Sequence, residues 1–274
     1  MKKKHSVKSL LIYIPLLLLV LFYTFPIFAL VNTSLKTTQE IKYGPMQLPQ
    51  KATLESYSAA MKRLVNPLIN SAKMSLLATF ISSGIGSMTG YMFSKFKFKG
   101  SNILFLVIII GFYIAPQSIL IPLVLFMGKM GLYNSVASLV LTHTAYGVPI
   151  TTMLFKNYYD NIPDELVDSA IVDGCDIPRI YTSIFLPLSL PGFAVVGIFQ
   201  FTNIWNEFLF GLTLTQGVNS QPITVAVSNL KGTTVAAWNQ ICAGAIISTL
   251  PVVVIYVVLM NLIVKGLLMG SVKG

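Results

Sequence analysis

The sequence predicts an all-α, polytopic membrane protein with six transmembrane helices in a single domain over residues 1–274. Of the 274 residues, 54% are hydrophobic and only 10% are charged, and the mean hydropathy is +0.75. A soluble domain carries about a quarter charged residues, so this chain cannot cover a globule with a wet surface. The net charge of +10 does not indicate a nucleic-acid partner. The basic residues fall mostly in short segments between apolar runs, as the positive-inside rule predicts for membrane proteins.

The first apolar run, Leu10 to Val31, follows a lysine-rich N-terminus and predicts a retained spanning helix. A cleaved signal peptide starts in the same way, but its apolar core is usually about 7–15 residues long and ends in small residues. This run has about twenty residues, enough to cross the hydrocarbon layer, and ends in the bulky Phe28 and Leu30. Residues 32–69 are then expected to form a polar outer loop with one short helix around Leu54–Leu64.

The second predicted span runs from Ile69 to Phe93 and contains two glycines at helical spacing. Gly86-Ser-Met-Thr-Gly90 is a small-xxx-small pattern that permits close approach of another helix. We favour this packing role over a phosphate-binding loop, because no strand precedes the glycines and no Lys-Ser/Thr follows them. Lys95, Lys97 and Lys99 come next and mark the cytoplasmic side.

The third predicted span, Ser101–Met127, should be kinked or locally opened, because Pro116 and Pro122 lie inside it. An outer turn over Gly128–Asn134 leads to the fourth span, Ser135–Phe155. This span contains His143, which we interpret as an interhelical hydrogen-bonding group, the commoner role of a lone histidine between threonines, and not as a ligand.

The fifth predicted span, Ile184–Phe208, is broken near its start by Pro187 and Pro191. An outer segment over Phe210–Asn239, rich in Thr, Gly, Gln, Asn and Ser, precedes the sixth span at Ile241–Val264.

Six spans place both termini in the cytoplasm, and the lysine clusters at the N-terminus and at Lys95–Lys99 decide this orientation. Cys175 and Cys242 then lie on opposite sides of the membrane and cannot pair within the chain. Their spacing does not fit a metal site, so no metal is expected.

One polar segment, Asn161–Pro191, separates the fourth and fifth spans. Asn161 is expected to cap a helix that Gly174 ends, since only glycine adopts a left-handed stop at little cost. Asp176 is expected to cap a second short helix, which begins near Pro178 and ends at Pro187. Six of the nine acidic residues of the chain lie in this segment or directly before it: Asp160, Asp164, Glu165, Asp168, Asp173 and Asp176.

Three interpretations of this segment compete. It can be a solvated linker whose acids keep it wet. It can be a catalytic cluster, but it has no histidine and one cysteine, so we expect no catalytic residue. It can be a docking element whose apolar stripe (Leu166, Val167, Ala170 and Ile171) enters a groove on another protein.

The segment resembles the cytoplasmic signature loop of bacterial ABC importer permeases: Glu-Ala-Ala, three residues, Gly, nine residues, Ile-x-Leu-Pro. This chain has Asp168-Ser169-Ala170, then Gly174, then Ile184-Phe-Leu186-Pro187, with the spacing kept. The first two positions depart mildly from the pattern. Further similarities to the carbohydrate-uptake branch occur in five places: Asn32-Thr-Ser-Leu-Lys36, Phe96-Lys-Phe-Lys-Gly100, Trp205-Asn-Glu-Phe208, Ala243-Gly-Ala245 and Gly270-Ser-Val-Lys-Gly274.

Over its whole length the chain therefore looks like the smaller, six-span permease subunit of maltose/oligosaccharide-type importers. The resemblance implies the type I importer permease fold, a bacterial inner (plasma) membrane location, and a cytoplasmic coupling helix within residues 161–187. It implies a second, different permease subunit, a cytoplasmic ATPase dimer and an extracellular solute-binding protein, which the loop Gly211–Trp238 would touch. The positions that would couple to the ATPase are Glu165, Leu166, Asp168, Ser169, Ala170, Asp173 and Gly174.

The sequence has no energy-coupling site of its own, as expected for a permease that works with a separate ATPase subunit. The chain has no Walker A pattern, so ATP and Mg²⁺ are expected on the partner ATPase and no cofactor on this chain. Nor does it have a chain of buried acids for proton coupling; Glu207 is the one acid near a span. The rival from another class is a membrane-embedded enzyme or secondary carrier that uses the acidic loop as a lid.

The cargo expected from the resemblance is a sugar or oligosaccharide, with a polyol or a glycerol phosphate still open. Four amides are candidates for cargo contact, each with interhelical bonding as its alternative role: Gln117, Gln200, Asn203 and Asn206.

Overall fold

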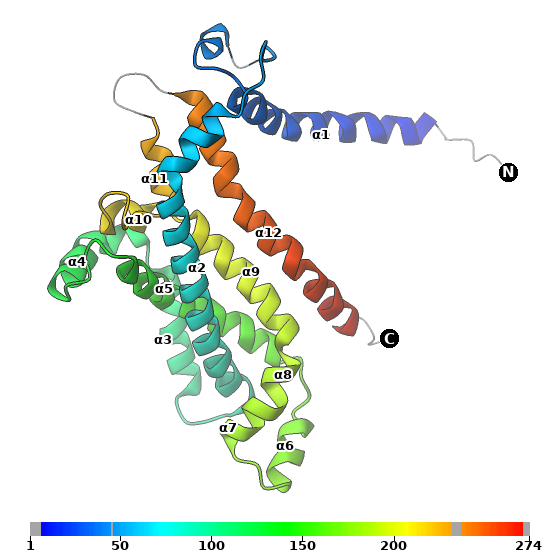
Figure 1. The fold of residues 1–274 in the computed structure, drawn as a ribbon. Coiled ribbons are helices and arrows are strands. Elements are labelled where there is room, and N and C mark those ends of the chain that lie inside the picture. The colour runs from blue at the N-terminus through cyan, green and yellow to red at the C-terminus, as the bar shows by residue number, and fades with distance from the viewer. Residues whose placement is uncertain (1–6, 45, 232–236, 271–274) are drawn as a thin grey trace. The chain divides into compact units, whose positions relative to one another are not determined.

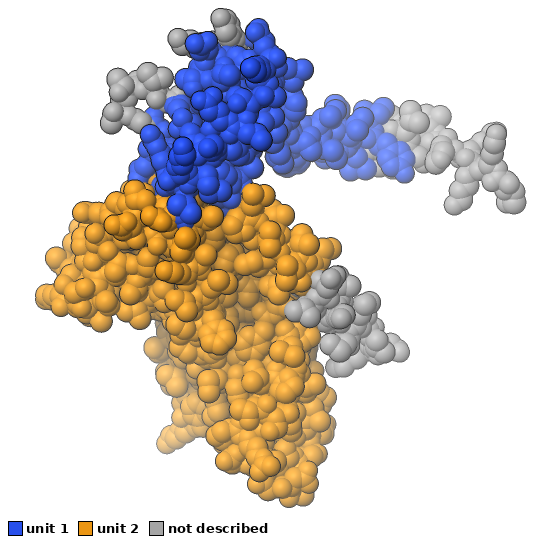
Figure 2. Space-filling model, in the orientation of Figure 1, with its two compact units in different colours: residues 1–65, 226–249 blue, residues 66–225, 250–274 orange. Residues whose placement is uncertain are grey.

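The computed structural model describes residues 7–44, 46–231 and 237–270. Over these ranges the chain is helical, and no strand occurs in them. The chain separates into two compact units, residues 1–65 with 226–249 and residues 66–225 with 250–274 (Figure 2).

The helices follow one another along the chain as Figure 1 labels them. The long ones are α1 (Val7–Ser34), α2 (Glu55–Lys95), α5 (Val136–Tyr159), α9 (Leu190–Asn206) and α12 (Trp238–Gly270). The shorter ones are η1 (Glu40–Tyr43), α3 (Ser101–Tyr113), α4 (Pro116–Lys129), α6 (Glu165–Val172), α7 (Ile177–Ile180), η2 (Tyr181–Phe185), α8 (Leu186–Leu188), α10 (Leu209–Leu214) and α11 (Ile223–Asn229).

Three described helices are long and apolar enough to cross a membrane: Tyr13–Ser34 of α1, α2, and Trp238–Met260 of α12. Two further spans qualify only as bent pairs, which brings the possible number to five. The predicted fourth span, in α5, does not reach the same apolarity, because it carries several threonines and His143. The membrane-spanning character is thus evident, whereas the count of six stays a prediction.

The two predicted breaks are present. α3 and α4 are bent by 93° around Ile114 and Ala115, directly before Pro116. Residues Ile177–Leu188 and α9 are bent by 75° at Ser189, two residues before Pro191. Each proline lies in the first turn of the helix after the break, where its missing N–H costs nothing.

One prediction was wrong at the second span. The short helix expected around Leu54–Leu64 is present, but no loop separates it from the span, since α2 begins at Glu55 and runs on for 41 residues through Pro67. An internal proline removes one helical hydrogen bond. Packing on both sides of it outweighs that loss, because Leu64 and Ser71 are fully buried.

In the first unit, the carboxylate of Glu40 holds the segment after α1 together. One oxygen accepts from the backbone N–H groups of Gln50 (2.9 Å) and Lys51 (3.2 Å), and the other from the N–H (2.9 Å) and hydroxyl (3.1 Å) of Thr37. The Thr37 backbone bond, with those from Lys51 and Gln50, outweighs burial and lowers the pKa of Glu40. At neutral pH this loop is therefore pinned by a charged group.

In the second unit, α2 and α5 approach closely through the predicted glycines. A Cβ at Gly86 would overlap the Thr151 side chain, and one at Gly90 would lie 2.7 Å from the backbone nitrogen of Lys156. The packing role predicted for this pair is confirmed. Below the contact lies a core cluster that draws on α2, α5, α6, α7, η2 and α9: Tyr91, Phe155, Tyr159, Val167, Ala170, Ile180, Tyr181, Phe185 and Val196.

Candidate functional site

The polar segment between α5 and α9 folds into α6 and a second helical stretch, Ile177–Leu188, which consists of α7, η2 and α8; α6 and α7 lie at one end of the second unit (Figure 1). Gly174 ends α6 with φ +80°, the left-handed conformation expected from the sequence. Its N–H donates to the Ile171 carbonyl, and the N–H of Cys175 donates to the Ala170 carbonyl, both at 2.9 Å, which completes a Schellman motif. Asp176 caps α7 as predicted, accepting from the N–H of Arg179 at 3.0 Å.

The start predicted for α6 was wrong. Asn161 does not cap it; its amide donates to the Asn157 carbonyl at the end of α5 (2.8 Å), and α6 begins at Glu165. The physical reason is the proline at 163, which disfavours helical backbone at Ile162 and so delays the helix.

Lys95, at the end of α2, holds the turn that leads into α6. Its ammonium donates to the Ile162 carbonyl (2.5 Å) and to a carboxylate oxygen of Asp164 (2.6 Å). The Lys95 side chain is 2% exposed and that of Asp164 78%, so the pair has one buried and one wet member. The ammonium also lies 5.9 Å from the centroid of the Phe185 ring. This lysine, which the sequence indicated only as a topology signal, fixes α6 to the core.

A second ion pair lies beside the first. Asp160 accepts from Lys156 (2.8 Å) and from the Ser94 hydroxyl (2.7 Å). Partial burial raises the pKa of Asp160, but the bonds from Lys156 and Ser94 outweigh it, and the net direction is down.

The apolar stripe of α6 is divided between the core and the surface. Val167 and Ala170 are buried in the core cluster, so they are not available to another protein. Leu166 and Ile171 stay exposed, and Val172, which the sequence interpretation left out, is 87% exposed. The other predicted coupling positions are all exposed: Glu165, Asp168, Ser169, Asp173 and Gly174. The interpretation of the whole stripe as a docking surface was therefore wrong for its two inward residues.

A cavity of about 390 Å³ lies elsewhere in the second unit, between α3, α5, α9 and α10. Two predicted cargo residues line it, Gln200 and Asn203. The other two, Gln117 and Asn206, are exposed and do not line this cavity. Its aromatic lining comes from Phe112, Tyr146, Phe199 and Phe210.

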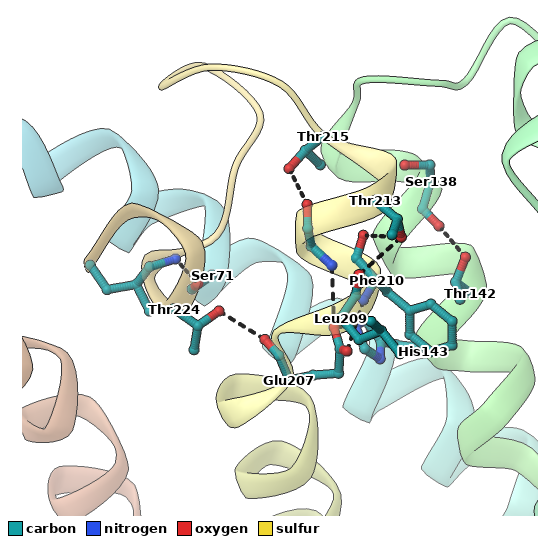
Figure 3. A network of polar contacts seen from close by, with 12 residues as sticks. Ser71, Ser138, Thr142, His143, Glu207, Leu209, Phe210, Thr213, Thr215 and Thr224 are labelled. Carbon is teal, nitrogen blue, oxygen red and sulfur yellow. Dashed lines mark hydrogen bonds and ion pairs between the residues drawn. The ribbon is translucent and has the colours of Figure 1, made fainter. Parts of the chain in front are cut away.

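Two polar residues that sequence reasoning did not assign to the cargo path, His143 and Glu207, also line the cavity. Figure 3 labels both side chains. His143 is 5% exposed, and its Nε2 has no hydrogen-bond partner among the described residues. Among the described residues, the Nε2 atom of His143 therefore does not make the interhelical hydrogen bond expected for this side chain. The nearest carboxylate oxygen, Oε2 of Glu207, is 3.6 Å away, beyond a normal hydrogen bond. The polar tripeptide Thr142-His143-Thr144 was the available signal, but nothing in the sequence pairs it with Glu207.

Glu207 follows the last turn of α9 and turns the chain into α10. Its Oε1 accepts from the N–H of Phe210 at 2.8 Å, and its Oε2 from the N–H of Gly211 at 3.3 Å (Figure 3). Its backbone carbonyl accepts from the Thr224 hydroxyl at 2.8 Å. The carboxylate is thereby fixed in place at the cavity wall.

A family model described as "Binding-protein-dependent transport system inner membrane component" matches residues 82–268. The chain belongs to this family. The permease is therefore a membrane transport subunit and not an enzyme, as the coupling-loop motif predicted.

Two relatives cover nearly the full length of the permease. A probable ABC transporter permease protein, PH1216 of Pyrococcus horikoshii, is 43% identical over 99% of this chain and 100% of its own. The xylose/arabinose import permease protein XacI of Haloferax volcanii is 31% identical over 90% of this chain and 87% of its own.

The fold also matches a solved structure. A bacterial ABC transporter involved in the import of the acidic polysaccharide alginate contains a chain that superposes with a TM-score of 0.79 at 17% identity, covering 95% of this chain and 98% of that one. The predicted importer-permease fold is confirmed.

Proposed function

We propose that the permease forms half of the translocation pathway for a sugar, and that an ATPase dimer moves it by docking on α6. The observation that carries this proposal is the build of the α6 loop. It exposes acids and the apolar Leu166, Ile171 and Val172, while Lys95 and the buried Val167 fix it to the transmembrane core. A displacement of α6 is therefore passed to α2 and α5.

The remaining partners follow from the family and from the loops. A second, different permease subunit supplies the other half of the pathway. A solute-binding protein delivers the cargo on the outer side, at Gly211–Trp238, of which residues 232–236 lie outside the described ranges. Both termini and α6 face the cytoplasm, and ATP with Mg²⁺ binds to the ATPase.

Sugar is the cargo class that the relatives support, because XacI is named for xylose and arabinose import. The two cavity amides, Gln200 and Asn203, supply hydrogen-bonding groups beside aromatic walls, as a carbohydrate requires.

Site-directed crosslinking tests the docking surface. In a background with both native cysteines replaced by serine, Ile171→Cys is compared with Val218→Cys. The two native side chains are apolar, β-branched and similarly exposed, at 52% and 48%. In native membranes Ile171→Cys should crosslink to a nucleotide-hydrolysing subunit, and Val218→Cys, in the outer segment, should not. A membrane-impermeant maleimide should label Val218→Cys in intact cells and Ile171→Cys only after lysis. The reverse labelling, or an ATPase crosslink from both positions, contradicts the proposal.

A further inference from the structure

We propose that His143 and Glu207 form a recognition site for a hydroxyl group of an uncharged carbohydrate. This inference rests on the proposed function and narrows it, because it assigns a charge class to the cargo and two residues to its recognition. It excludes uronic acids, sulfonated sugars and glycerol phosphate as preferred cargo.

The pair formed by His143 and Glu207 has hydrogen-bonding capacity that the described residues do not use. His143 Nε2 is buried without a partner among the described residues, although it lines a cavity that can hold a ligand. A buried polar atom left unpaired is destabilising, so such an atom at a cavity wall points to a ligand or a bound water.

The Glu207 carboxylate can accept a further hydrogen bond. Oε1 of Glu207 accepts from the N–H of Phe210 at 2.8 Å and Oε2 from the N–H of Gly211 at a long 3.3 Å, and the N–H groups of Phe208 and Leu209 lie near the carboxylate as well. A carboxylate has about four acceptor positions in all, so Oε2 retains capacity for a further donor. Oε2 lies 3.6 Å from His143 Nε2. A hydroxyl placed between the two atoms can donate to Oε2 and accept from Nε2 in the histidine tautomer that carries its proton there, which suits this spacing.

Aromatic rings form the cavity wall around His143. The ring of Phe210 lies 5.6 Å from the His143 ring and 5.3 Å from the Tyr146 ring, centroid to centroid. The cavity therefore offers apolar aromatic faces next to a few fixed polar atoms, the arrangement common to small-molecule sites. Gln200 and Asn203 add neutral amides and no charge.

The charge of the cavity lining favours an uncharged cargo. Among the residues that the structure describes, the lining of this cavity includes the Glu207 carboxylate and no lysine or arginine. An anionic cargo group would meet this negative charge with no cationic side chain of the described lining beside it, and the repulsion is stronger where water is partly excluded than in bulk water. A neutral polyol or sugar meets no such barrier. The proposal thus departs from the alginate importer, whose cargo is named as acidic.

The test uses the assembled transporter with its ATPase and second permease, solubilised from the membrane. Binding of maltose, xylose, glycerol and glucuronate is measured by calorimetry on wild type, Glu207→Gln and His143→Phe. His143→Phe keeps an aromatic ring against Phe210 and removes the ring nitrogens. Thr142→Val is the matched control, because the Thr142 hydroxyl bonds within α5 and does not line the cavity.

Wild type should bind at least one of the neutral probes and not glucuronate. The affinity for that probe should fall about tenfold in both cavity variants, the loss expected for one charge-assisted hydrogen bond, and stay unchanged in Thr142→Val. Unchanged affinity in His143→Phe, or glucuronate binding as tight as that of the neutral probes, overturns the inference. The Ile171→Cys crosslink distinguishes this failure from failure of the proposed function, since it reports docking irrespective of cargo.

Discussion

Replacement of Lys95 by methionine should release the α6 loop from the transmembrane core. Methionine keeps most of the length and the apolar stem of lysine and removes the ammonium that bonds Ile162 and Asp164. Lys95 itself is buried, so its loss cannot be made good by another side chain at the surface. We expect the turn before α6 to open more often.

The size of the destabilisation depends on which of the two partners of Lys95 is exposed to solvent. Asp164 is 78% exposed and regains water when the lysine is removed, so its half of the pair contributes little. The Ile162 carbonyl loses a charge-assisted bond, and such bonds contribute about 1.5–3 kcal/mol. A local destabilisation of about 2 kcal/mol corresponds to an opening equilibrium raised about thirtyfold.

Hydrogen exchange measures this opening directly, because exchange by local unfolding tracks its free energy. Amides of α6 should exchange about thirtyfold faster in Lys95→Met, and sugar uptake per ATP hydrolysed should fall. The matched control is Lys156→Met, which breaks the neighbouring pair with Asp160. That pair is a partly exposed i, i+4 pair, and such pairs contribute about 0.3–0.5 kcal/mol. Exchange of the α6 amides in Lys156→Met should therefore change less than about threefold. Equal exchange in the two variants would refute the assignment of Lys95 as the anchor.

Three further predictions concern single sites. The pKa of Glu40 is lowered in the folded loop, so its stabilisation is present above the ordinary value of about 4.5 and is lost as the pH falls through the lowered value; protease resistance of the loop should persist at pH 5 and disappear in stronger acid, and Glu40→Gln should abolish that pH dependence. Gly147→Ala should destabilise the protein by about 1–3 kcal/mol and weaken cargo binding, because the new methyl would overlap the Gln200 amide; thermal unfolding and calorimetry measure the two effects. Gly174→Ala should cost about 1–2 kcal/mol through its positive φ, visible as faster exchange in α6, whereas Gly197→Ala, with open space around it and ordinary helical backbone, should be neutral or slightly stabilising.

Features set by neighbouring residues were predictable from the sequence. The stop at Gly174 and the cap at Asp176 depend on backbone groups within a few positions, and both are as predicted. The breaks at Pro116 and Pro191 have equally local causes. The close approach of α2 and α5 was predictable because only glycine at 86 and 90 leaves room for it.

Features that depend on distant residues were not predictable in this way. The stripe on α6 has the right period, but periodicity does not say whether a partner or the chain's own core covers it. Here Val167 and Ala170 face the chain's own core. The bond between Lys95 and Ile162 joins α2 to a loop far along the chain. The same holds for His143 and Glu207, whose atoms lie 3.6 Å apart because the end of α9 and α10 both pack against α5.

α5 connects the two functional ends of the second unit, and this gives the proposed mechanism its physical basis. Near its start it presents His143 to the cavity, and at its end Phe155 and Tyr159 pack in the core cluster beside Val167 of α6. At 1.5 Å of rise per residue, His143 and Tyr159 lie about 24 Å apart along one helix. α5 contains Pro149 and is closely packed against α2 through Gly86 and Gly90, so we expect a shift of α6 to move α5 and not only its last turn. The bends before Pro116 and at Ser189 lie on either side of α5 in the chain, so they are the positions where a shift of α5 can be absorbed while the cavity changes shape.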